Sequence, residues 1–163
     1  MGEEDRFRRA VEFVLGHEGG YVSHPDDPGG ETAYGLSKRQ YPDLDMTSLT
    51  REQAIEIYRR DWWERYGYGR LPEPLAVKVF DLAVHVGPQA AHRMLQRALR
   101  TCGEALDVDG ILGPKTLEAA GRVDVEACLR ELRAEAALYY CGLIRRRPQL
   151  ERFARGWMRR AVT

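Results

Sequence analysis

Residues 17–36 read HEGGYVSHPDDPGGETAYGL, and this stretch contrasts with the regular sequence before it. From Glu4 to Leu15, apolar residues recur every three or four positions, which predicts an amphipathic helix. The glycines that follow end this helix, and the prolines and glycines further on exclude another one. We therefore expect Glu18 at a helix terminus, followed by an ordered loop or a short β-hairpin.

The rest of the chain predicts a succession of helices. Thr50 and Gln53 form a capping-box pattern, which opens a helix that runs to about Arg65. Prolines are favoured in the first turn of a helix, and Gly87 is suited to end one. The pattern predicts a mostly α fold, and later helices are expected to begin at Pro72 or Pro74, at Pro88, at Pro114, after Asp124 and near Leu150.

The composition is that of a folded globular protein. The chain has 163 residues, of which 44% are hydrophobic and 31% charged. The net charge of zero argues against a general nucleic-acid binder, and no apolar run is long enough to span a membrane. Residues 1–9 are too charged for a signal peptide, and three cysteines suit a reducing compartment. We therefore expect synthesis in the cytoplasm without a signal peptide.

The zero net charge hides an asymmetry between the two halves. Residues 1–82 carry 11 basic and 16 acidic side chains, whereas residues 83–163 carry 14 basic and 9 acidic ones. The segment 143–163 alone holds seven arginines and one glutamate. Such a segment is either a solvated helix face or a surface that meets an anionic polymer, such as a cell wall or a nucleic acid.

Two carboxylates in the opening stretch suggest chemistry. Cleavage of a glycosidic bond uses one carboxylic acid to protonate the leaving oxygen and one carboxylate to activate water or stabilise positive charge. Glu18, at the edge of an apolar helix, suits the acid, and Asp27, in a glycine-rich loop, suits the ionised partner. Thr32 is placed to hold a water molecule. Alternatively, Glu18 is a surface charge and Asp27 a turn former before Pro28.

Three motifs together resemble glycoside hydrolase family 108, which comprises bacterial and phage N-acetylmuramidases with a lysozyme-like fold. The first motif runs from Glu18 to Leu36, and the second is Phe80–Pro88. The third, Val108–Thr116, is similar to the signature of the helical, peptidoglycan-binding-like region that follows in these proteins. The resemblance extends from about Phe7 to Arg160.

The resemblance implies a division into a muramidase lobe over residues 1–90 and a helical peptidoglycan-binding-like lobe over residues 91–163, with a cleft between them. It implies hydrolysis of the β-1,4 bond between N-acetylmuramic acid and N-acetylglucosamine. Glu18 is then the catalytic acid, with Asp27 and Thr32 as partners, because Glu18 and Asp27 are separated by eight residues as in phage-type lysozymes. This arrangement favours inversion at the anomeric carbon and needs no metal or other cofactor.

Four further residues are candidates for substrate binding. Tyr21 and Tyr34 belong to the first motif, and Tyr34 is expected to line the cleft. Trp63 is expected to be exposed, and able to stack on a sugar, while its neighbour Trp62 lies in the core. His85 stands where the family usually has asparagine. It either contacts substrate or is a hydrogen-bonded histidine in the core or at the cleft edge.

Other functions remain open from the sequence. A lytic transglycosylase would use Glu18 as both acid and base. A non-catalytic wall-binding module would rely on Val108–Thr116 and the arginine-rich tail. We expect a monomer that binds peptidoglycan rather than nucleic acid and acts on the cell wall after release or export. A holin or a secretion machinery would be a partner, and a secreted effector would also need an immunity protein.

Overall fold

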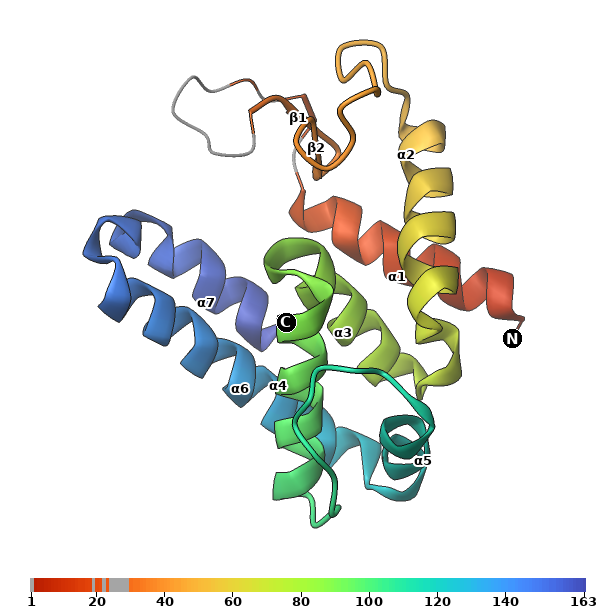
Figure 1. The fold of residues 1–163 in the computed structure, drawn as a ribbon, viewed down its shortest axis with the longest axis vertical. Coiled ribbons are helices and arrows are strands. Elements are labelled where there is room, and N and C mark those ends of the chain that lie inside the picture. Colours follow the sequence, from red (N-terminus) through yellow and green to blue (C-terminus); the bar gives the residue numbers. More distant parts are fainter. Residues whose placement is uncertain (1, 19, 22, 24–29) are drawn as a thin grey trace. The chain divides into compact units, whose positions relative to one another are not determined.

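The protein is almost entirely helical, as the sequence predicts. The computed structural model describes residues 2–18, 20, 21, 23 and 30–163. Within this part of the chain, one small β-hairpin accompanies seven α-helices (Figure 1). The chain forms two compact units, residues 1–69 and residues 70–163, which are described separately.

Unit 1 consists of two main helices and the hairpin. The capping box predicted at Thr50 is present, because the Thr50 side chain accepts from the Gln53 amide and the Gln53 side chain accepts from the Thr50 amide. Ion pairs from Arg59 to Glu4 and from Arg51 to Glu12 join the two helices. The elements are α1 (Glu3–His17), β1 (Thr32–Ala33), β2 (Leu36–Ser37), α2 (Arg51–Tyr58), the π-helical segment η1 (Arg59–Glu64) and the 3₁₀ turn η2 (Tyr68–Arg70).

The π-helical segment η1 explains why one prediction was wrong. Trp63 was expected on the exposed side of a regular helix, but it is only 2% exposed, and Trp62 is buried as well. A π-helix has more residues per turn than an α-helix, so neighbouring residues diverge less around its axis. Both indoles can therefore lie on the inner side, where Trp63 packs edge-on against Phe7 and Tyr68.

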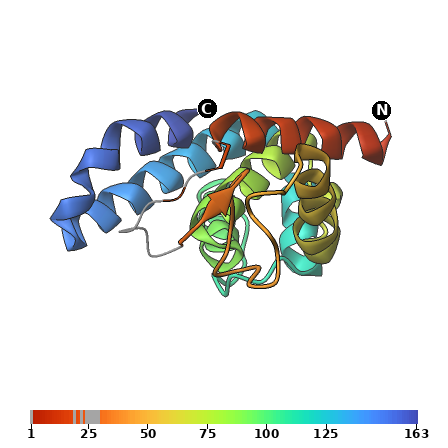
Figure 2. The same cartoon turned by 90° about the horizontal axis from the view of Figure 1, so that it is seen from above.

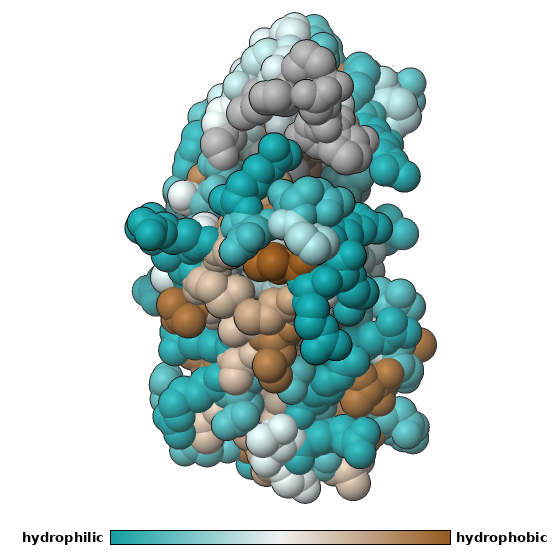
Figure 3. Space-filling model, turned by 90° about the vertical axis from the view of Figure 1, so that its left-hand side faces the viewer, coloured by the Kyte–Doolittle hydropathy of each residue, from teal (hydrophilic) through white to brown (hydrophobic). Residues whose placement is uncertain are grey.

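Unit 2 is a bundle of helices. In both ribbon views α6 and α7 lie side by side and run in opposite directions (Figure 1 and Figure 2). Seen from the side on which these two helices are joined, hydrophilic residues cover most of the surface, with apolar patches between them (Figure 3). The elements are α3 (Glu73–Val86), α4 (Pro88–Thr101), α5 (Pro114–Arg122), α6 (Val125–Arg146), the 3₁₀ segment η3 (Pro148–Phe153) and α7 (Ala154–Val162).

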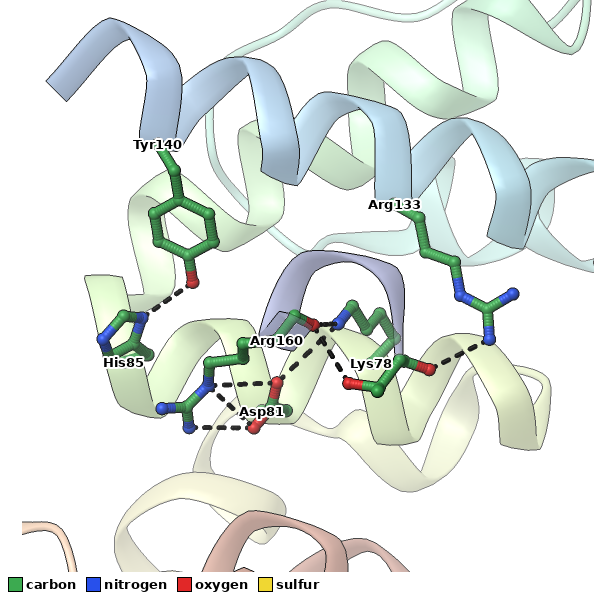
Figure 4. A network of polar contacts seen from close by, with 7 residues as sticks. Lys78, Asp81, His85, Arg133, Tyr140 and Arg160 are labelled. Atoms are coloured by element: carbon green, nitrogen blue, oxygen red, sulfur yellow. Dashed lines mark hydrogen bonds and ion pairs between the residues drawn. The ribbon is translucent and has the colours of Figure 1, made fainter. Parts of the chain in front are cut away.

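A buried ionic network ties α7 to α3 (Figure 4). The Arg160 guanidinium binds the fully buried Asp81 carboxylate, with Nη2 2.8 Å and Nε 3.1 Å from Oδ1. Lys78 Nζ donates to the Arg160 carbonyl and lies 3.9 Å from Asp81. Burial lowers the pKa of Lys78 to about 8, although the Asp81 charge opposes this. Asp81 thus compensates two buried cations.

We expect Asp81→Asn to destabilise the protein by about 3–5 kcal/mol, because it leaves Arg160 and Lys78 buried without a compensating charge. Urea denaturation followed by circular dichroism measures the loss. Asp107→Asn, at an exposed position, is the matched control and should change the free energy of unfolding by less than about 0.5 kcal/mol. A loss below about 1 kcal/mol for Asp81→Asn would contradict this role.

The motif at residues 108–116 fastens a loop to α4. Gln96 of α4 makes two of the hydrogen bonds that hold this loop. Its Nε2 donates to Asp109 Oδ1 at 2.7 Å, and its Oε1 accepts from the Gly110 amide at 2.8 Å. His92 Nδ1 lies 2.9 Å from the Gly110 carbonyl, so this nitrogen carries the hydrogen. Gln96, His92 and Thr116 are buried. These side chains therefore hold the loop in place.

We expect His92 to make the protein less stable in mild acid. Burial lowers its pKa, while the hydrogen bond to Gly110 partly opposes this. Above the unfolded value of about 6.5, His92 is neutral in both states. As the pH falls below it, the unfolded chain takes up the proton first, so stability is lost. His92→Asn keeps a donor near Nδ1 and cannot titrate. Between pH 7 and 5, the free energy of unfolding of His92→Asn, from urea denaturation, should fall less than that of wild type. Equal falls would show that His92 does not cause the loss of stability in acid.

Candidate active site

Glu18 lies where α1 ends. Its amide makes the last helical hydrogen bond, to the Val14 carbonyl at 3.0 Å, and its backbone then turns to an extended conformation (φ −90°, ψ 134°). The side chain is half-buried. The end of the helix therefore fixes the position of the Glu18 backbone, as expected from the glycines that follow it.

The segment after the loop forms a short hairpin rather than an irregular loop. β1 and β2 are antiparallel, with Thr32 opposite Ser37 and Ala33 opposite Leu36. Tyr34 and Gly35 make the two-residue turn, and both have positive φ angles, of 52° and 81°. This is the geometry of a type I′ turn, which matches the twist of the strands. A non-glycine residue in this conformation costs about 1–2 kcal/mol, and Tyr34 is such a residue.

The hairpin turn lies directly against Glu18. A Cβ atom at position 35 would be 2.6 Å from Glu18 Cγ and 2.6 Å from Tyr58 Oη, distances that real atoms do not adopt. Tyr58, at the end of α2, donates from its hydroxyl to the Tyr34 carbonyl at 2.8 Å. The hairpin turn thus lies against Glu18 at the end of α1 and against Tyr58 at the end of α2.

The structure brings some of the predicted site residues together. Thr32 and Tyr34 belong to the same hairpin that contacts Glu18, and both are half-buried. Tyr21 follows Glu18 closely in the chain, and its side chain is 48% exposed. Asp27, the predicted second carboxylate, lies outside the described residues. The sequence did not predict the role of Tyr58, whose hydroxyl supports the turn.

Two predicted substrate contacts have other surroundings. Trp63 belongs to the core of unit 1, so its ring offers no exposed face for a sugar. His85, near the end of α3, is half-buried in unit 2, and its Nδ1 is hydrogen-bonded to Tyr140 Oη at 2.7 Å (Figure 4). Its ring also packs edge-on against Trp157. These contacts favour the interpretation of His85 as a hydrogen-bonded structural histidine.

The described residues were also searched for metal-binding clusters and for helices that could cross a membrane. No group of three or more His, Cys, Asp or Glu side chains there could hold a metal ion. No helix among these residues is long and apolar enough to cross a membrane.

Comparisons with known proteins place the chain in a family. A family model described as glycosyl hydrolase 108 matches residues 11–87, and one described as a predicted peptidoglycan domain matches residues 90–162. A solved structure of SagA from Brucella abortus is 30% identical in sequence with a TM-score of 0.80, and the match covers 97% of this chain and 90% of SagA. The chain belongs to glycosyl hydrolase family 108. A search of curated proteins found no match.

Membership of family 108 confirms the resemblance found in the sequence, including its peptidoglycan-binding-like region. The lysozyme-like, mostly helical fold class is confirmed as well. The family supports a glycosidase, and the second family model supports peptidoglycan as its substrate. The first family model extends through α3, which packs within unit 2 of the structure. The functional division at residues 90 and 91 stays a prediction.

We expect Gly35→Ala to destabilise this family 108 protein by more than about 2 kcal/mol. A methyl group would combine an unfavourable positive φ with a clash against Glu18 and Tyr58. Gly30→Ala is a matched control, because Gly30 also has a positive φ (70°) but open space around it. Gly30→Ala should lower the free energy of unfolding by about 1 kcal/mol. Urea denaturation of both variants isolates the steric effect, and equal losses would show that residue 35 does not press on Glu18.

Proposed function

We propose that this chain is an N-acetylmuramidase that hydrolyses the β-1,4 bond between N-acetylmuramic acid and N-acetylglucosamine in peptidoglycan. Glu18 is the general acid, and Asp27 and Thr32 position the attacking water. The observation that most directly supports Glu18 as the general acid is its contact with Gly35. This contact fixes the Glu18 side chain beside a strained turn. Strain of this kind is concentrated at functional sites.

In the proposed reaction the protonated Glu18 carboxyl group donates its proton to the glycosidic oxygen. The bond between this oxygen and the anomeric carbon breaks, and positive charge develops on the sugar ring. Water attacks the anomeric carbon from the opposite face and gives a proton to Asp27, while the Thr32 hydroxyl orients the water. The product is inverted, and no cofactor takes part. This route requires about 6.5–9.5 Å between the carboxyl groups, to make room for the water.

Two tyrosines complete the proposed site. The Tyr34 backbone has a positive φ, and the hydrogen bond from Tyr58 holds it in this conformation. The ring of Tyr34 is therefore a suitable wall for a sugar. Tyr21 is exposed on the segment that leaves Glu18. Because peptidoglycan lies outside the cytoplasmic membrane, the proposed enzyme acts on the cell wall after release or export.

The test is digestion of purified sacculi by wild type and Glu18→Gln. We expect Glu18→Gln to lower the release of reducing sugar by at least about 10³-fold with an unchanged melting temperature, because the amide cannot donate the required proton. Glu52→Gln, at an exposed position of α2, is the matched control and should keep full activity. Full clearing of sacculi by Glu18→Gln would remove Glu18 from the mechanism.

The products of the same digestion separate the related mechanisms. Mass spectrometry of the muropeptides should show reducing ends, whereas anhydro ends would identify a lytic transglycosylase. The anomeric configuration of fresh product, followed by NMR, should be inverted; retention would indicate a covalent intermediate on Asp27. Binding to sacculi without any release of sugar by wild type would identify a non-catalytic wall-binding module.

A further inference from the structure

Unit 2 carries a groove between α4 and α6 that the proposed hydrolysis does not use. Two neighbouring hollows, of about 560 and 440 Å³, make up this groove, and they share Arg93, Arg97 and Glu135. Arg100 completes one hollow, and Arg146 and Tyr139 line the other. The lining thus holds four guanidinium groups and one carboxylate.

The arginines of α4 stand on one face of the helix. Positions 93, 97 and 100 are four and three residues apart, so they follow one stripe about 10 Å long. The opposite face of α4 is apolar and buried, as Leu95 and Ala98 show. Packing of this inner face leaves the arginine stripe along the edge of the groove.

Several arginines elsewhere in the protein pair with acids. Arg59 binds Glu4, Arg122 binds Glu104 and Arg160 binds Asp81. In contrast, no described carboxylate lies within 4 Å of the guanidinium nitrogens of the groove arginines, Arg93, Arg97, Arg100 and Arg146. Like charges at this helical spacing repel one another, so the cluster destabilises the folded chain slightly. An anionic partner would remove this repulsion.

The polar side chains that hold the motif resembling a peptidoglycan-binding signature point inward. Gln96, Thr116 and His92 are buried and hold the 108–116 loop. A ligand of unit 2 must therefore meet outward side chains, and the α4–α6 groove combines two adjoining hollows with a net positive lining. Guanidinium groups bind carboxylates through two parallel hydrogen bonds, which favours a carboxylate-bearing partner.

We propose that the α4–α6 groove binds the stem peptides of peptidoglycan through their free carboxylates. This inference rests on peptidoglycan being the substrate. The glycan strand of peptidoglycan is uncharged where the carboxyl group of muramic acid is joined to the peptide, so its negative charges lie on the stems. Arg93, Arg97 and Arg100 pair with these carboxylates, and Tyr139 offers an aromatic surface beside them. The groove then holds the wall polymer by its peptides while the glycan is cleaved elsewhere.

The test compares two triple variants in a Glu18→Gln background, which prevents digestion during the measurement. One variant is Arg93→Gln/Arg97→Gln/Arg100→Gln, and the matched control, Arg145→Gln/Arg147→Gln/Arg155→Gln, removes three exposed charges outside the groove. Binding is measured by cosedimentation with purified sacculi free of phosphate polymers. A second sample of sacculi has its carboxylates converted to methylamides with carbodiimide and methylamine.

We expect the groove variant to bind native sacculi at least tenfold more weakly than its parent. The affinity of the control variant should fall less than threefold. Conversion of the carboxylates to methylamides should weaken the binding of the parent to sacculi by the same factor. The binding of the groove variant should not change. The groove variant should also keep the melting temperature of its parent. Equal losses in both triple variants, or binding that does not respond to methylamide formation, would overturn the proposal.

The outcome is separable from that of the proposed hydrolysis, which is measured with the wild-type glutamate. If wild type releases no sugar yet binding depends on the groove and on the carboxylates, the hydrolase assignment fails and the groove assignment stands. If sacculi are digested normally and the groove variant binds them as its parent does, the groove assignment alone fails. Competition by a soluble phosphate polymer, with no effect of methylamide formation, would assign the groove to phosphates and refute the stem peptide.

Discussion

The close approach of Gly35 to Glu18 is the constraint on which the candidate active site depends. Only glycine leaves room for the Glu18 side chain and the Tyr58 hydroxyl at this turn. The same glycine also permits the positive φ that a type I′ turn requires at its second position. One residue without a side chain therefore sets both the shape of the hairpin and the place of the carboxyl group.

Strain and support are combined at this turn. Tyr34 adopts a positive φ that a glycine or an asparagine would adopt more easily. The Tyr58 hydroxyl, which is buried with its ring at the end of α2, binds the Tyr34 carbonyl and holds this conformation. A tyrosine retained at an unfavourable position is consistent with a requirement for its side chain, and the proposed sugar-binding wall supplies one.

Unit 2 uses its polar residues in two contrasting ways. Inside, Asp81 neutralises the buried Arg160, and Gln96 satisfies the amide and side-chain groups of the 108–116 loop. Such internal networks specify one arrangement of the helices, and their side chains are buried. Along the α4–α6 groove, no described carboxylate lies within 4 Å of the guanidinium nitrogens of the arginines. The family signature thus shapes the unit, while the proposed ligand contacts come from residues outside it.

The sequence alone determined the helices and the family. The signals for the helices are local: apolar periodicity, the capping box at Thr50 and the positions of Pro88 and Pro114. Local signals depend on residues close together in the sequence, so they can be recognised without the tertiary structure. The placement of Glu18 at a helix end is local for the same reason. The burial of Trp63 was decided by a π-helical segment that no residue spacing announces. The Gly35 contact and the arginine groove arise from packing between elements distant in the chain, which only the tertiary structure could show.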